Sequence, residues 1–185
     1  MATDPSTPDP VHGIEFPRFL QLFDQLAQFT ESWLDRMPAE RLDWAPIDNA
    51  SMRFGDRVSR ITVKGLVIHV CIGEKQWVEG IERIEEGGSI PIPKQKDLEQ
   101  TLAASDWRGE ARRMHAQNMA RLRSAYTPAH LRKTVHFADH RYSGMGLLWA
   151  MYAHRAFHLG NIDIYLRQTD TVAPDFFRFP SDVMA

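Results

Sequence analysis

The sequence predicts an all-α protein, a four-helix bundle, from three observations: the placing of its prolines, a helical period in its apolar residues and a scarcity of strand patterns. After residue 17 the prolines stand only at positions 38, 46, 91, 93, 128, 174 and 180, which leaves long blocks without proline. Because proline interrupts the interior of a helix, each block can hold one long helix. Long amphipathic helices with few strands favour a bundle.

The first two blocks predict one helix each. Apolar residues recur at intervals of three and four over about residues 17–36, as they do on a core-facing helix. In the second block the predicted helix runs from Ile61 to Glu86 and stops at Gly87-Gly88, a pair suited to a left-handed turn. The run ITVKGLVIHV at its start also fits a buried strand, but the length of the whole segment favours a helix.

The last two blocks predict two more long helices, over about residues 107–126 and 146–168, with Ser105 or Asp106 as the cap of the first. A short helix is expected just before that cap. Residues 131–142 read as two short extended pieces or irregular chain. Because the connections after the second and third helices are long, a simple up-down-up-down order does not follow.

We expect one bundle domain over residues 16–170, with a disordered leader at residues 1–15 and a tail at residues 171–185 that covers one end of the bundle. A net charge of −2 gives no bulk attraction to nucleic acid or anionic lipid. No apolar run is long enough to span a bilayer. A single cysteine, Cys71, excludes an intramolecular disulfide framework and, without a secretory signal, fits a cytoplasmic protein.

The fourth helix carries His154 and His158, which are four residues apart and therefore project from one face. The same face carries Leu147, Met151, Ile162 and Tyr165. It is therefore expected to point inward, where a polar group without a partner costs about 1–3 kcal/mol. One shared divalent metal would satisfy both imidazoles. The alternative is that each ring donates to a carbonyl or a carboxylate and simply packs.

His69 on the second helix supplies a third candidate ligand. It lies on a mostly apolar stripe, and Gly73 follows it one turn later on the same side. A glycine inside a helix costs about 1 kcal/mol relative to alanine. Gly73 is therefore expected either to leave space beside the metal for a substrate or to allow close helix packing. Three neutral imidazoles with an open position are typical of a catalytic metal site.

Other histidine, acidic, cysteine and arginine residues give weaker indications of a functional site. His136 and His140 are also four residues apart, but in an extended chain this spacing does not place them on one face. Glu74 is expected on the surface or in a structural role, and Cys71 is expected to pack as a small apolar residue. In HRAFH the residue after the first histidine is Arg155, whereas the zincin motif needs a glutamate there. The arginines of the third helix favour a solvated face over contact with nucleic acid.

The histidine of the second helix and the segment HRAFHLGNIDIYLR of the fourth resemble the DinB/YfiT-like superfamily of metal-binding four-helix bundles. That family typically places one histidine on its second helix and an H-x-x-x-H pair on its fourth. The matching positions here are His69, His154 and His158, and residues 42–46 are similar to the family's link between the first two helices.

The resemblance implies that these three histidines hold a divalent metal, with zinc as the first expectation and nickel or iron as alternatives. Family members with assigned activities are similar to thiol transferases. The implied function is a metal-dependent S-transferase, or a related detoxification or stress-response enzyme, that acts on a small molecule with a low-molecular-weight thiol and forms a homodimer. No catalytic residue is assigned. Phe157 and Asn161 depart from the family pattern, which usually has a polar residue and a glutamine there. The alternative is a non-catalytic bundle protein of the stress response that binds a metal or a small ligand.

Overall fold

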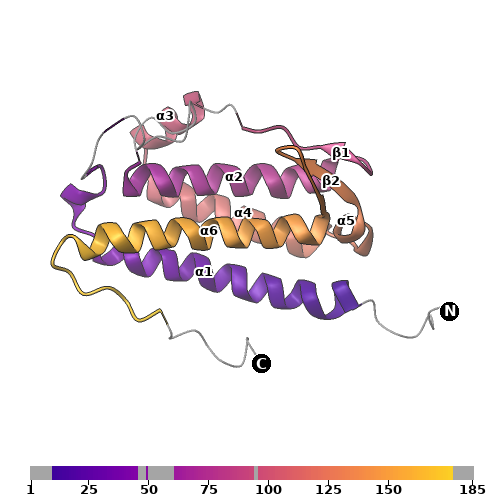
Figure 1. Ribbon diagram of the computed structural model, residues 1–185, viewed down its shortest axis with the longest axis horizontal. Helices are drawn as coiled ribbons and strands as arrows, with labels where there is room; N and C mark the ends of the chain where they lie inside the picture. The colour runs from indigo at the N-terminus through magenta and orange to yellow at the C-terminus, as the bar shows by residue number, and fades with distance from the viewer. Residues whose placement is uncertain (1–9, 46–48, 50–60, 94–95, 177–185) are drawn as a thin grey trace.

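Four long helices lie side by side in the computed structural model, which describes residues 10–45, 49, 61–93 and 96–176 (Figure 1). They are α1 (Phe16–Arg36), α2 (Val63–Arg83), α4 (Trp107–Ala125) and α6 (Gly144–Arg167). Each falls within a few residues of a predicted helix, and the predicted four-helix bundle is confirmed. None of the described helices combines the length and the apolarity that crossing a bilayer requires.

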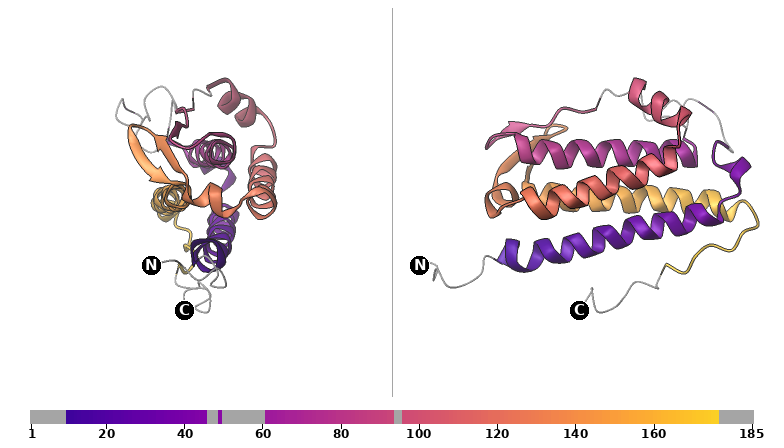
Figure 2. Two further views of the ribbon diagram at one scale, coloured as in Figure 1. Left: turned by 90° about the vertical axis from the view of Figure 1, so that its right-hand side faces the viewer. Right: turned by 180° about the vertical axis from the view of Figure 1, so that it is seen from behind.

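The order of the helices in space is not their order in the chain. Helix α2 packs between α4 and α6, whereas α1 packs mainly against α6. In Figure 1 the chain runs from right to left in α1, from left to right in α2 and α4, and back again in α6. The right-hand view of Figure 2, taken from behind, shows α4 beside α2 and running in the same direction. Helices α2 and α6 are therefore antiparallel neighbours, and the chain does not follow the simple up-down-up-down order, a point that the sequence left open.

Long connections make this order possible. The link between α2 and α4 contains β1 (Gly88–Ser89) and the expected short helix α3 (Lys96–Ala104). The link from α1 to α2, residues 37–62, is also long, which the sequence prediction did not include. It contains the segment at residues 42–46 that is similar to the family's link, and this segment is described only as far as residue 45.

The link between α4 and α6 contains α5 (Pro128–Arg132), β2 (Thr134–Phe137) and β3 (His140–Ser143). The two strands are the extended pieces predicted over residues 131–142, whereas α5 was not predicted. Strands β2 and β3 pair antiparallel, and β1 pairs parallel with β2, so the sheet order is β1-β2-β3. This small sheet lies across one end of the bundle (Figure 1).

Side-chain caps fix where three of the long helices begin. Thr62 Oγ1 accepts a hydrogen bond from Gly65 N at 3.0 Å at the start of α2. Asp106 and Ser143 cap α4 and α6 in the same way, so that Asp106 is the cap, rather than Ser105. Such caps satisfy amide groups that the first helical turn leaves without a backbone partner.

The ends of the chain differ in part from expectation. Residues 11–15 form a helical turn that continues into α1, so this part of the expected disordered leader is helical. Residues 1–9 lie outside the described residues. After α6 the chain returns along α1, where Arg36 Nη1 donates to the carbonyl of Val172 at 2.7 Å. The rest of the predicted tail, residues 177–185, is also outside the described part.

A buried ion pair divides the core into two apolar clusters. One cluster lies around Leu66, Ile72 and Leu159, and the other around Trp77 and Met151. Between them, the guanidinium of Arg155 on α6 meets the carboxylate of Glu74 on α2. The pair lies at the level where α2 and α6 carry the candidate histidines.

Candidate metal centre

The structure brings together the three histidines that the sequence singles out. His69 comes from α2, and His154 and His158 come from α6, its antiparallel neighbour. His154 Nε2 lies 3.2 Å from His69 Nε2 and 3.0 Å from His158 Nε2. His158 is buried and the other two are partly exposed, so the group lies at the edge of the core.

The distances between these nitrogens fit a shared metal ion. Each ring nitrogen carries either a proton or a lone pair, so His154 Nε2 makes a good hydrogen bond with one of its two neighbours at a time. A divalent ion accepts all three lone pairs. Tetrahedral zinc–nitrogen bonds of about 2.0 Å separate the ligand atoms by about 3.3 Å. The two separations measured from His154 Nε2 are close to that value.

The surroundings of His158 favour the neutral imidazole that metal binding needs. Burial, and then the neighbouring His69, lower the pKa of His158 from its usual value to about 4. A buried, uncharged ring keeps a lone pair for a cation at neutral pH. The electrostatics of the site therefore agree with its geometry.

Asn161 is placed to orient His158 from behind. Its amide nitrogen lies 3.5 Å from Nδ1 of His158, the ring nitrogen that does not contact His154. A half-turn of the amide would present its oxygen to the Nδ1–H group. Metal-binding histidines generally donate their second N–H to an oxygen acceptor of this kind. Asn161, which stands where the sequence resemblance expects a glutamine, is thus next to Nδ1 of His158.

Gly73 borders the same site without being a tight helix contact. A Cβ atom at this position would have His154 Cε1 at 4.0 Å as its one non-local neighbour within that distance. Of the two expectations for Gly73, this spacing favours room beside His154 over close packing of helix backbones.

Glu74 is buried in the core, and a surface role for it is wrong. Its two carboxylate oxygens accept hydrogen bonds from Arg155 Nε and Nη2, both at 2.7 Å. The side chains of Glu74 and Arg155 are only 1% and 5% exposed. The expected structural role fits this pair. Sequence reasoning missed Arg155 as its partner, although an arginine on an apolar stripe was a signal.

Cys71 lies beside this pair, fully enclosed. Burial raises the pKa of Cys71 to about 12, so its thiol stays protonated at neutral pH. This agrees with the expectation that Cys71 packs as a small apolar residue.

The second histidine pair does not join the candidate centre. His136 lies on β2 and His140 on β3, and in the register of the hairpin they are not opposite each other. His136 Nδ1 lies 3.1 Å from the carbonyl oxygen of Gly87. Among the described residues, the group with metal-ligand spacing contains His69, His154 and His158 alone.

The arginines of α4 form ion pairs on the outside of the bundle. Arg112 Nη2 lies 2.6 Å from Glu31 Oε2, Arg108 also contacts Glu31, and Arg121 contacts Glu82. These arginines therefore pair with carboxylates on neighbouring helices at the surface of the bundle.

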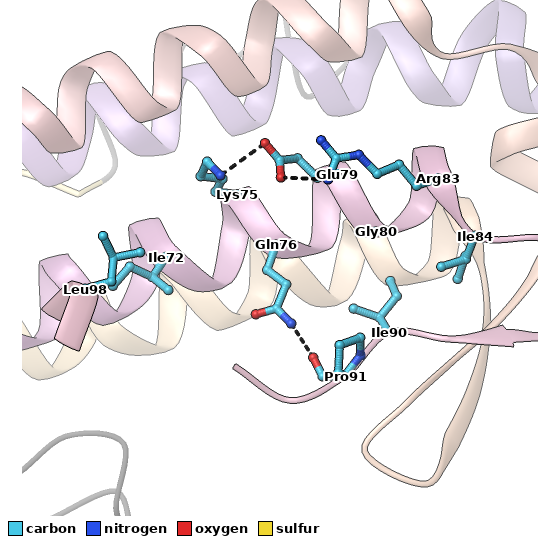
Figure 3. A pocket seen from close by; sticks show the side chains of 10 residues that line it. All are labelled: Ile72, Lys75, Gln76, Glu79, Gly80, Arg83, Ile84, Ile90, Pro91 and Leu98. Carbon is cyan, nitrogen blue, oxygen red and sulfur yellow. Dashed lines mark hydrogen bonds and ion pairs between the residues drawn. The ribbon is translucent and has the colours of Figure 1, made fainter. Parts of the chain in front are cut away.

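A pocket of about 250 Å³ lies between α2 and the segment that follows β1 (Figure 3). Its cations, Lys75 and Arg83, both contact Glu79, and Gln76 donates to the carbonyl of Pro91. The pocket contains none of the three histidines. Its charges are thus engaged with each other, and we assign it no part in the chemistry of the centre.

Comparisons with known proteins agree with the architecture. The model of the DinB family matches residues 10–176. A DinB-like protein of Bacillus subtilis, YjoA, superposes with a TM-score of 0.63 at 15% identity, over 88% of this chain and 99% of its own. YfiT of the same organism is described as a probable metal-dependent hydrolase with an unusual four-helix bundle topology. It superposes with a TM-score of 0.63 at 14% identity, over 90% of this chain and 93% of its own. None of the curated proteins matches this sequence significantly.

Proposed function

Because this chain belongs to the DinB family, we propose that it is a metal-dependent enzyme, a thiol S-transferase, whose divalent ion binds to His69, His154 and His158. The observation that carries the proposal is the convergence of three imidazole nitrogens from two antiparallel helices. Zinc is the expected ion, with nickel or iron as alternatives, since three imidazoles suit all of these ions. The proposed enzyme acts on a small molecule and is a homodimer.

Three histidines leave coordination positions for a further ligand. An ion held there would lower the pKa of a bound thiol and keep the thiolate ready to attack an electrophilic carbon. In the reaction a sulfur–carbon bond forms, the bond from that carbon to its leaving group breaks, and the thiol proton passes to solvent. The chain's own part is to keep the imidazole of His158 neutral, to orient this ring through Asn161 and to leave room beside Gly73.

The acid–base groups around the centre are compatible with a thiol as the nucleophile. Among the described residues, the group with metal-ligand spacing contains no carboxylate, and nearby Glu74 is neutralised by Arg155. A thiol, with an ordinary pKa of about 8.5, needs no separate base once it is bound to a cation. Hydrolysis is the second candidate, because YfiT is described as a probable metal-dependent hydrolase.

Metal content tests the ligand set. We expect purified protein to contain about one divalent ion per chain and His154→Ala to lose most of it. The matched control is His140→Ala, which removes an exposed histidine from the other pair, and it should keep the full content. Elemental analysis measures the metal content of both variants, after circular dichroism has shown that each is folded. A full metal content in His154→Ala would show that the assignment on α6 is wrong.

Thiol binding tests the reaction class. Cobalt-substituted protein should develop sulfur-to-metal charge-transfer absorption when a small thiol takes the open position. We expect this signal with at least one thiol of a panel, and S-alkylation of that thiol by an electrophile such as monobromobimane should be accelerated. A metal-loaded protein that shows neither response would support the alternative of a non-catalytic metal- or ligand-binding bundle.

A further inference from the structure

Trp77 of α2 has a buried indole N–H group without an acceptor. The residue is 7% exposed, and Nε1 finds no hydrogen-bond partner among the described residues. Other indoles of the bundle are satisfied: Trp33 Nε1 donates to Asp163 at 2.8 Å, and Trp149 Nε1 donates to Glu15 at 2.7 Å. Trp77 Nε1 is one of five buried side-chain atoms without a partner among the described residues, and the one indole among them. Because native structures leave few buried donors without partners, it needs an explanation.

The place of Trp77 suggests that explanation. It follows Gly73 by one helical turn and His69 by two, and it is buried at the border of the candidate centre. Its ring lies edge-on to the imidazole of His154, with 5.2 Å between centroids, and edge-on to Phe137 of β2 at 5.1 Å. Trp77 therefore forms a wall between one proposed metal ligand and the β-hairpin.

We propose that the indole N–H of Trp77 donates a hydrogen bond to an oxygen of the molecule that binds at the three-histidine centre. The inference rests on the proposed function, because it takes this centre as the binding site. Trp77 is then a ligand-positioning residue. The ligand class it selects is a small molecule with a carboxylate or carbonyl oxygen within a few bonds of the atom that binds the metal.

The chemistry of the wall supports an oxygen acceptor. An indole N–H is a donor only, so the missing partner must be an acceptor. Phe137 and the ring of Trp77 itself are apolar surfaces, which suit the carbon part of a small molecule. Gly73 keeps the approach to His154 free of a side chain. A ligand with one polar end and a short apolar body satisfies all three features.

The test compares two thiols that differ in the acceptor. Zinc-loaded protein is titrated with 3-mercaptopropionate, which carries a carboxylate, and with 1-propanethiol, which does not. Trp77→Phe keeps a large ring but removes the N–H. We expect it to weaken the binding of 3-mercaptopropionate about tenfold and to change the affinity for 1-propanethiol less than about twofold. Trp149→Phe, the matched control, should change the affinity for neither thiol. An equal effect on both thiols, or none, would overturn the inference.

A spectroscopic measurement on the wild-type protein does not depend on how well the variant folds. The indole ¹⁵N–¹H signal of Trp77, identified by its absence in Trp77→Phe or by standard backbone-linked assignment, should move downfield with 3-mercaptopropionate but not with 1-propanethiol. Acetohydroxamate, an oxygen ligand of zinc, separates the two proposals. If it alone binds and shifts the Trp77 signal, the thiol chemistry is wrong and the role of Trp77 stands. No shift with any bound ligand removes that role.

Discussion

At the scale of single residues, His115 of α4 links the stability of the bundle to pH. It lies inside the bundle, with Nε2 3.1 Å from Asp24 Oδ1 and its ring against Phe23. Burial is the largest cause that lowers the pKa of His115 below its usual value. In the unfolded chain the ring takes up a proton near pH 6.5, whereas the folded state resists it. Falling pH therefore favours unfolding, and stability is lost as the pH drops below about 6.5.

We predict that the free energy of unfolding of the metal-free protein falls as the pH is lowered from 7.5 to 5.5. In His115→Gln this free energy should fall by less over the same interval. Urea denaturation in the presence of a chelator, repeated at several pH values, measures the difference. The comparison uses the slope, because the substitution also changes stability at every pH. His140→Gln, on the exposed side of the hairpin, should keep the wild-type slope. An unchanged slope in His115→Gln would contradict the burial argument.

The same scale shows what spacing along the sequence can and cannot predict. His154 and His158 were identifiable because a four-residue interval on a helix places two side chains on one face. The contacts of Trp77 with His154 and of Arg155 with Glu74 were not identifiable, because they depend on how α2 and α6 are aligned. Glu74 and Arg155 are 81 residues apart in the chain, and no local period connects them.

At the scale of the elements, the Glu74–Arg155 pair links α2 to α6 in the layer that carries the histidines. Arg155→Met should lower the free energy of unfolding by about 3–5 kcal/mol, because it leaves a buried carboxylate without its counterion. The double variant Glu74→Leu/Arg155→Met should recover most of this loss, since no buried charge remains. Urea denaturation of the single and double variants measures the coupling.

A surface pair supplies the control for that experiment. Arg167 Nε lies 2.6 Å from Asp163 Oδ2 on the exposed side of α6. Arg167→Met should cost no more than about 1 kcal/mol, the usual limit for exposed ion pairs. If Arg155→Met were equally mild, or if the double variant were no more stable than the single one, the pair would not have the structural role assigned to it.

The elements also differ in how well the sequence predicted them. The four long helices were predictable because their apolar stripes and the intervening prolines extend over many residues. Helix α5 spans only Pro128–Arg132, and β1 only Gly88–Ser89, too short for any period to stand out. Strand β1 exists because β2 lies beside it in the fold. Such short elements depend on tertiary pairing, which a local pattern does not contain.

At the scale of the whole molecule, the long connections put α2 and α6 next to each other in opposite directions. His69 and His154 are 85 residues apart in sequence, yet their Nε2 atoms meet at 3.2 Å. An ion bound between them would contact the two helices together and would bind the folded state in preference to the unfolded chain. Binding of this kind raises the stability of the entire bundle by mass action.

We therefore predict that removing the metal destabilises the whole protein. At zinc concentrations about 100 times the dissociation constant the gain is about 2.7 kcal/mol, which for a domain of this size corresponds to about 5–10 °C in Tm. Calorimetry at pH 7.5 should show this fall after chelation and its reversal when zinc is restored. His154→Ala should melt at one temperature with or without zinc, whereas His140→Ala should respond as the wild type does. A wild-type melting curve that ignores zinc would contradict the bridging of α2 and α6 by a metal ion.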